Sequence, residues 1–124
     1  MNEVVNIARC FERFADTFSP KIIAELNGQY VLAARVDGDK VPWHRHARED
    51  EMFLVTDGVL EVHLRDRQVT VRAGEFFVVP RGVEHRVVGR GMVQLLLFEP
   101  AGVQHTGDVQ SEITKAAFER LDPE

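Results

Sequence analysis

Residues 51–79, EMFLVTDGVLEVHLRDRQVTVRAGEFFVV, decide the fold class, because they hold four short apolar runs separated by turn residues. The run at residues 59–64 alternates apolar and polar side chains, which is typical of a β-strand with one buried face. Asp57-Gly58 and Ala73-Gly74 separate the runs, and such pairs favour turns. The stretch therefore predicts consecutive strands, at residues 51–55, 59–64, 69–72 and 76–79.

The same pattern extends in both directions along the chain. Asn27-Gly28, a strong hairpin signal, separates two earlier runs, and two later runs follow the opening stretch, which adds strands at residues 21–26, 29–36, 85–88 and 92–98. Eight or nine short strands with no helix between them close most economically into a barrel or jelly roll, because closure removes exposed strand edges. We expect an all-β fold, with one domain over residues 1–124 and a barrel core at about residues 20–100.

The two ends of the chain show a different pattern. A helix is predicted at about residues 4–16 from an apolar stripe with spacings of four, three and four. The stripe consists of Ile7, Phe11, Phe14 and Phe18. This helix should end before Ser19-Pro20, since proline restricts the residue in front of it. A second short helix is expected near the C-terminus from Ile113, Ala116, Ala117 and Leu121.

Composition narrows the classes of function. The chain has 124 residues, of which 44% are hydrophobic and 28% charged, as in ordinary globular proteins. A formal net charge of −5 argues against nucleic acid as a partner, because binding to phosphates needs a basic face. The longest strongly apolar run, residues 93–98, is too short to cross a membrane. The single cysteine, Cys10, excludes an intrachain disulfide and predicts a cytoplasmic location.

Four residues have the chemistry of a metal site. His44 and His46 lie two positions apart, so on an extended strand both side chains project from one face. Glu51 alternates with apolar residues, and a buried carboxylate is costly unless a cation balances it. His85 comes from a strand that a barrel brings close. Taken singly, each histidine is explained as well by a surface position, and Glu49 and Asp50 compete with Glu51 as the carboxylate.

The spacing of these residues resembles two motifs of the cupin superfamily, in order. The first is Gly38, five residues, His44-Arg45-His46, four residues, Glu51, six residues and Gly58. The second is Gly74, five residues, Pro80-Arg81-Gly82, two residues and His85, with Gly89 where the family commonly has asparagine. The spacing to Gly58 favours Glu51 over the two neighbouring carboxylates. The resemblance implies a double-stranded β-helix that holds one divalent iron, manganese, nickel or zinc ion through His44, His46, Glu51 and His85.

The chain as a whole also resembles small bacterial cupins labelled mannose-6-phosphate isomerase-like. The residues that carry this likeness are Trp43, Asp50-Glu51, Val79-Pro80, Glu99-Pro100 and Thr106-Gly107-Asp108. The resemblance implies a metal-dependent enzyme that acts on a small polar molecule, of isomerase, lyase or dioxygenase type. The alternative is a non-catalytic module that uses the metal to bind or sense a small molecule or anion. The resemblance to small cupins also implies that the protein is a homodimer.

Three further residues are candidates for the pocket. Gln94 interrupts an apolar strand, where it either binds a ligand or faces solvent. Tyr30 alternates with Leu32 and Ala34, so it belongs equally well to the core or the pocket. Phe53 shares the face expected for Glu51 and is expected to pack rather than to stack on a substrate.

Overall fold

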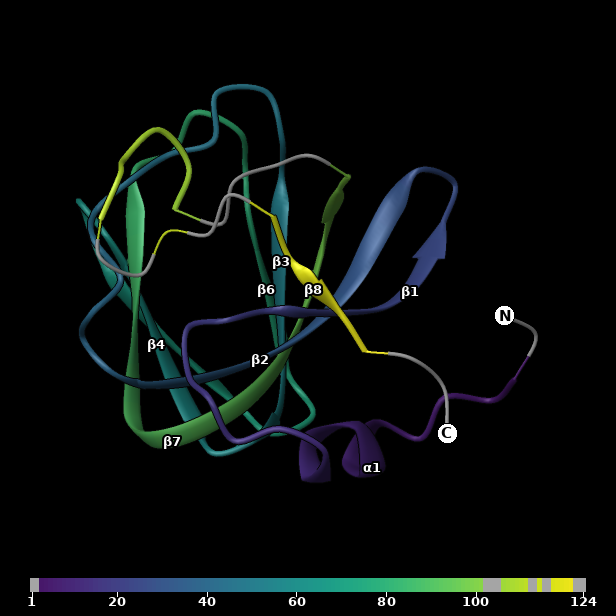
Figure 1. The fold of residues 1–124 in the computed structure, drawn as a ribbon. Helices are drawn as coiled ribbons and strands as arrows, with labels where there is room; N and C mark the ends of the chain where they lie inside the picture. The colour runs from purple at the N-terminus through teal and green to yellow at the C-terminus, as the bar shows by residue number, and fades with distance from the viewer. Residues whose placement is uncertain (1–2, 102–105, 112–113, 115–116, 122–124) are drawn as a thin grey trace.

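The computed structural model describes residues 3–101, 106–111, 114 and 117–121. Within these residues the chain forms one helix and eight strands, arranged as the expected all-β double-stranded β-helix (Figure 1). The elements are α1 (Ile7–Glu12), β1 (Lys21–Leu26), β2 (Gln29–Gly38), β3 (Glu51–Asp57), β4 (Val59–Leu64), β5 (Gln68–Arg72), β6 (Phe76–Val79), β7 (His85–Pro100) and β8 (Glu119–Arg120). The strand order is β5-β4-β7-β2-β1-β8, and β3 pairs with both β6 and β7.

Strand β7 joins the parts of the barrel. Its first residues pair with β4, and its later residues pair with β2 on one edge and β3 on the other. Figure 1 shows β7 curving around the lower end of the barrel to make these contacts. The prediction of two separate strands here was wrong, because the chain stays extended and paired through Gly89, and Gly91 with φ of 75° lies within the same strand.

The interior of the barrel is apolar. Strand alternation places Val93, Leu95 and Leu97 in one continuous core with residues from β2, β3 and β4. Leu32 and Leu60 have no exposed surface. Burying each such side chain contributes about 1.5–3 kcal/mol to folding. This core closes the barrel around the site described below.

The N-terminal helix is shorter than predicted. It begins after Asn6, whose side chain caps the Arg9 amide, and it ends at Glu12 instead of residue 16. Phe11 and Phe14 still cover an outer face of the barrel, against Ala33 and Leu96. The predicted stripe divides after that point, because Phe18 adopts φ of 55° and packs in the interior core. The described residues contain no helix long and apolar enough to cross a membrane.

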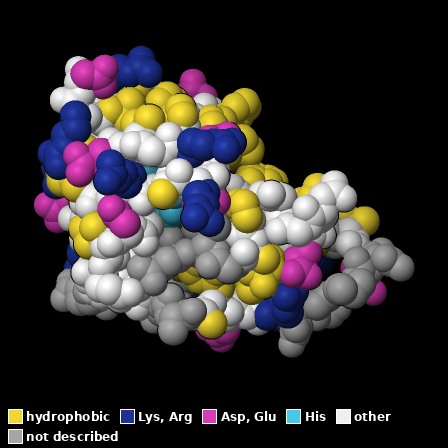
Figure 2. Space-filling view, turned by 90° about the horizontal axis from the view of Figure 1, so that it is seen from above, with side chains coloured by type: hydrophobic (Ala, Val, Ile, Leu, Met, Phe, Trp, Pro, Cys, Tyr) yellow, Lys and Arg dark blue, Asp and Glu magenta, His cyan; other side chains and the backbone are white. Residues whose placement is uncertain are grey.

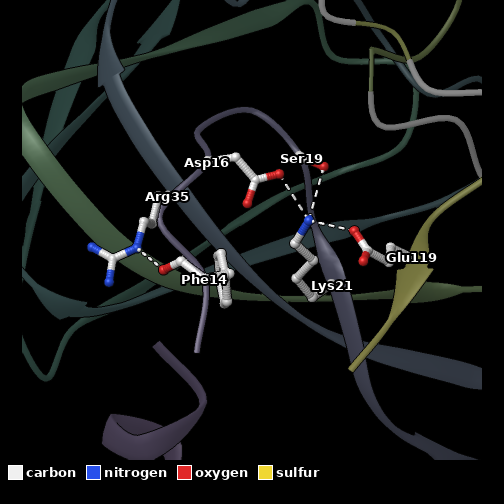
Figure 3. Close-up of polar contacts among 6 residues, drawn as sticks. All are labelled: Phe14, Asp16, Ser19, Lys21, Arg35 and Glu119. Carbon is white, nitrogen blue, oxygen red and sulfur yellow. Dashed lines mark hydrogen bonds and ion pairs between the residues drawn. The ribbon is translucent and has the colours of Figure 1, made fainter. Parts of the chain in front are cut away.

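The side chain of Lys21 in β1 bonds to the segment before β1 and to β8 near the end of the described residues. Its buried ammonium donates to Asp16 at 2.8 Å, to Ser19 at 3.2 Å and to Glu119 of β8 at 2.8 Å (Figure 3). Strand β8 runs parallel to β1 at this point. The predicted C-terminal helix is therefore wrong for the described residues 117–121, which contain β8, while Ile113 and Ala116 lie outside the described residues.

Candidate functional site

Backbone pairing brings the two histidine-containing segments together. His44 and His85 exchange both backbone hydrogen bonds, with N–O distances of 2.9 and 2.8 Å. The Gly82 amide donates to the carbonyl of His46 at 2.8 Å. The expected strand at residues 44–46 is thus reduced to one bridge inside a loop. The rings of His44 and His46 nevertheless lie on the same side, with centroids 5.2 Å apart.

Glu51 is the first residue of β3 and points into the barrel. It alternates with Phe53 and Val55, and its exposed fraction is 2%. Its Oε1 lies 3.4 Å from His46 Nε2 and 3.3 Å from His85 Nε2. One donor atom from each of four buried residues falls within 4.8 Å of every other, and the four are His44, His46, Glu51 and His85. The structure thus brings together the four residues that the spacing singles out.

The other two acidic residues of this segment do not belong to the cluster. Asp50 is exposed, and its carboxylate accepts a hydrogen bond from the Arg81 amide at 2.8 Å. Glu49 is half-buried but lies outside the group of mutually close donors. The inward direction of β3 at Glu51 decides among the three carboxylates.

Two imidazole nitrogens of the cluster are buried without a hydrogen-bond partner among the described residues. His44 Nδ1 lies 2.7 Å from the Pro42 carbonyl oxygen, and His85 Nδ1 lies 2.9 Å from that of Val83. A carbonyl only accepts, so each Nδ1 carries a proton, and in the neutral form of such a ring the Nε2 lone pair faces the cluster. His44 Nε2 and His46 Nε2 are buried without a hydrogen-bond partner among the described residues. Lone pairs that converge on a carboxylate require a cation between them.

The protonation states of the four residues depend on one another. Burial alone would lower the pKa of His46, but the hydrogen bond with Glu51 and the charge of Glu51 raise that pKa above its ordinary value. Burial lowers the pKa of His44 to about 4, so its ring is neutral near pH 7. Burial alone would raise the pKa of Glu51, but hydrogen bonds with His46 and His85 hold that pKa below its ordinary value. A neutral imidazole and an ionised carboxylate are the forms that bind a divalent metal.

A small cavity of about 40 Å³ lies beside the cluster. His44 and Glu51 contribute its polar lining, and Val36, Phe53 and Leu95 are among its apolar residues. The volume has room for a few water molecules. Phe53 therefore packs at the edge of the cavity.

The other two candidate pocket residues lie elsewhere. Tyr30 is half-buried and packs against the interior core without lining this cavity. Gln94 lies between the inward-facing Val93 and Leu95, so it projects from the outer surface of β7.

The loops around the cluster carry charged pairs. Arg45 lies 3.7 Å from Asp108, and Arg81 lies 3.4 Å from Asp50. Figure 2, which views the molecule from above, shows a small area of histidine surface bordered by Lys and Arg side chains. These surface pairs are exposed and contribute little stability.

Sequence reasoning gave Glu99 no role in the site. This residue is 1% exposed and alternates with the inward-facing Leu95 and Leu97 on β7. Pairing of Met52 with Phe98 places Glu99 beside Glu51 on the neighbouring strand. The same alternation that identified Glu51 would have identified Glu99, had it been applied to the end of β7.

A family model described as a cupin domain matches residues 34–99. Among relatives by sequence is the uncharacterized protein YdbB of Bacillus subtilis, which is 28% identical over 87 residues. That match covers 69% of this chain and 76% of YdbB.

Solved structures also match most of the chain. A cupin-2 domain containing protein from Shewanella frigidimarina is 37% identical with a TM-score of 0.77, and the match covers 78% of this chain and 94% of that chain. Protein NMB1881 from Neisseria meningitidis is 28% identical with a TM-score of 0.72, covering 80% of this chain and 100% of that one. The segment matched by the family model contains all four residues of the cluster.

Proposed function

Because this chain belongs to the cupin family, we propose that its three clustered histidines and Glu51 hold one divalent metal ion that serves a reaction on a small polar molecule. The observation that carries the proposal is the set of buried imidazole lone pairs directed at Glu51. His44 Nε2 and His46 Nε2 have no hydrogen-bond partner among the described residues. Three nitrogen donors and one oxygen donor suit iron, manganese, nickel or zinc.

The surrounding residues prepare the site for such an ion. The carbonyls of Pro42 and Val83 fix the tautomer and the ring orientation of His44 and His85. The apolar lining, which includes Phe53, keeps bulk water away from the donors. When bound, a divalent ion polarises a carbonyl group or lowers the pKa of a coordinated water.

The cavity limits how a substrate approaches. At about 40 Å³ it accommodates a small oxygen-bearing group rather than a whole sugar or amino acid. We infer that a substrate presents a carbonyl, hydroxyl or carboxylate to the site while the rest of it stays near the loops. Isomerase, lyase and dioxygenase reactions all fit this mode of binding.

Elemental analysis of untagged protein, purified without chelator, tests the metal. We expect about one equivalent of iron, manganese, nickel or zinc in the wild type and less than a tenth of that in His46→Ala. His63→Ala is the matched control, because His63 contacts Glu61 and Arg86 outside the cluster. Absence of metal from the wild type, even after each ion is supplied, would contradict the proposal.

The identity of the metal then directs the search for a reaction. Iron points to a search for oxygen uptake, whereas zinc, nickel or manganese points to isomerase and lyase substrates. Turnover that is lost in His46→Ala supports the enzyme. Tight binding of a small molecule without product supports the alternative, a sensor that uses the same metal.

Three finer expectations stay predictions. They are the mannose-6-phosphate isomerase-like grouping, the cytoplasmic location and the homodimer. Sedimentation equilibrium of the purified protein tests the last of these.

A further inference from the structure

Glu99 lies in the interior of the barrel without an evident structural reason. Its carboxyl group is 1% exposed, and neither of its oxygens has a hydrogen-bond partner among the described residues. Burying a carboxyl group without a hydrogen-bond partner is unfavourable when the group is neutral and more unfavourable when it is charged. Such a group at the end of a strand therefore calls for a functional explanation.

The position of Glu99 connects it to the cluster. In the pairing of β3 with β7, Met52 lies opposite Phe98, so the next inward-facing residues, Glu51 and Glu99, are neighbours. The charge of Glu51 acts directly on Glu99. Glu99 does not belong to the four residues whose donor atoms lie within 4.8 Å of one another. It therefore stands behind Glu51 and not among the ligands.

The geometry points to Glu99 as a positioning residue, which holds the Glu51 carboxylate in the orientation that the metal requires. Glu51 Oε1 faces His46 and His85, at 3.4 and 3.3 Å. When a metal binds Glu51, we expect a neutral Glu99 to turn its carboxyl group toward Glu51 and donate one hydrogen bond, which fixes the rotation of the Glu51 carboxylate about its last bond.

This inference rests on the proposed metal site and adds a residue to it. Hydrogen-bonding partners of metal ligands fix the orientation of those ligands, and their loss weakens metal binding by about 10–100-fold. The role needs a donor of the right length at residue 99, and it does not need a charge there. Two variants separate these requirements. Glu99→Gln keeps the length and supplies an N–H donor, whereas Glu99→Leu keeps the bulk and supplies none.

The test uses Co²⁺ as the probe metal, because its visible absorption reports the ligand geometry. We expect Glu99→Gln to bind Co²⁺ within about threefold of wild type and with the same spectrum. Glu99→Leu should bind about 10–100-fold more weakly, with a shifted spectrum. Gln94→Leu, on the outer surface of the same strand, is the control and should match wild type.

The outcomes distinguish this inference from the proposed function. If wild type binds Co²⁺ and His46→Ala does not, the metal site stands, and equal binding by Glu99→Leu overturns the role of Glu99 alone. Equal losses in Glu99→Gln and Glu99→Leu also overturn it, because they show that a charge is needed. If wild type binds no Co²⁺, both proposals fail. Should Glu99→Leu not fold, Glu99→Asp, which withdraws the carboxyl group by one methylene, replaces it with the same expected loss.

Discussion

Gly107 lies against the two residues that begin the histidine pair. A Cβ atom at this position would stand 2.4 Å from the Arg45 carbonyl oxygen and 2.8 Å from His44 Cδ2. Both atoms are too close for any side chain, and the φ of 58° adds strain for any residue but glycine. The loop at Gly107 thus packs directly against the backbone of Arg45 and the ring of His44.

We predict that Gly107→Ala weakens metal binding by at least tenfold, because the loop must shift and carry His44 with it. The control is Gly91→Ala, which has a similar φ of 75° but no atom within 4 Å of the new Cβ. Both variants pay about 1–2 kcal/mol for the left-handed backbone. Isothermal titration with Zn²⁺ measures the difference, and equal affinities in the two variants would exclude the proposed contact as a determinant of the site.

Single residues also show how far the sequence leads. Alternation with Phe53 and Val55 predicted the buried carboxylate at Glu51, and the structure confirms it at 2% exposure. The same reasoning left Gln94 undecided, and its outward direction became visible only from its neighbours Val93 and Leu95. Glu99 was assigned no role in the site because it stands next to Pro100, where the end of the strand was expected, and the direction of its side chain was not considered.

At the level of elements, Lys21 holds the segment before β1 and the short strand β8 together. Asp16 and Glu119 both accept from its ammonium at 2.8 Å, and the Leu121 amide donates to the Ile22 carbonyl. The hydrogen bond from Lys21 lowers the pKa of Asp16 below 3.8. A carboxylate with a lowered pKa in the folded state stabilises the protein above its ordinary pKa, and that contribution disappears as the pH falls through the folded value.

We therefore predict that Asp16→Asn lowers the free energy of unfolding at pH 7, and that the difference from wild type vanishes as the pH falls below 3.8. The Asp16 side chain is 53% exposed, so the loss should stay below about 1 kcal/mol. Urea denaturation at several pH values measures it. Asp39→Asn, an exposed carboxylate in the loop after β2, serves as the reference. A difference that does not shrink as the pH falls through the lowered pKa of Asp16 would rule out the ion pair as its source.

Strands were predicted more accurately than helices. The ranges 21–26, 59–64 and 76–79 agree with β1, β4 and β6, because alternation and flanking turn residues act locally. The helix was overestimated, since Phe14 and Phe18 fit a helical period but are held by tertiary contacts. Arg35, for example, donates to the Phe14 carbonyl at 3.1 Å (Figure 3), a contact that no local pattern contains.

The whole molecule keeps its barrel closed with apolar contacts. Residues from β1 to β7 meet in one interior core, which reaches the cluster through Phe53 and Val87. The lone pairs of the three clustered histidines call for a cation beside Glu51, whereas the apolar core closes the barrel without one. A metal ion at a hundred times its dissociation constant adds about 2.7 kcal/mol to stability.

We predict that removal of the metal by a chelator lowers the melting temperature but leaves the protein folded. Near-ultraviolet circular dichroism, with its signal from Trp43 and the phenylalanines, should persist in the chelated protein. Readdition of the metal should restore the melting temperature, and His46→Ala should melt at the lower value with or without chelator. Unfolding of the wild type at 25 °C on chelation would instead assign the ion a structural role.

By itself, the sequence determined the class of fold, most of the strands and the three histidines of the cluster, because period, turn residues and motif spacing are all local along the chain. Only the tertiary structure decided which carboxylate faces the histidines, that β7 is one strand, and that Glu99 stands behind Glu51. These features depend on how distant strands pair and on which face each residue then occupies. Pairing between distant strands is set by the packing of the whole core, which no single segment encodes.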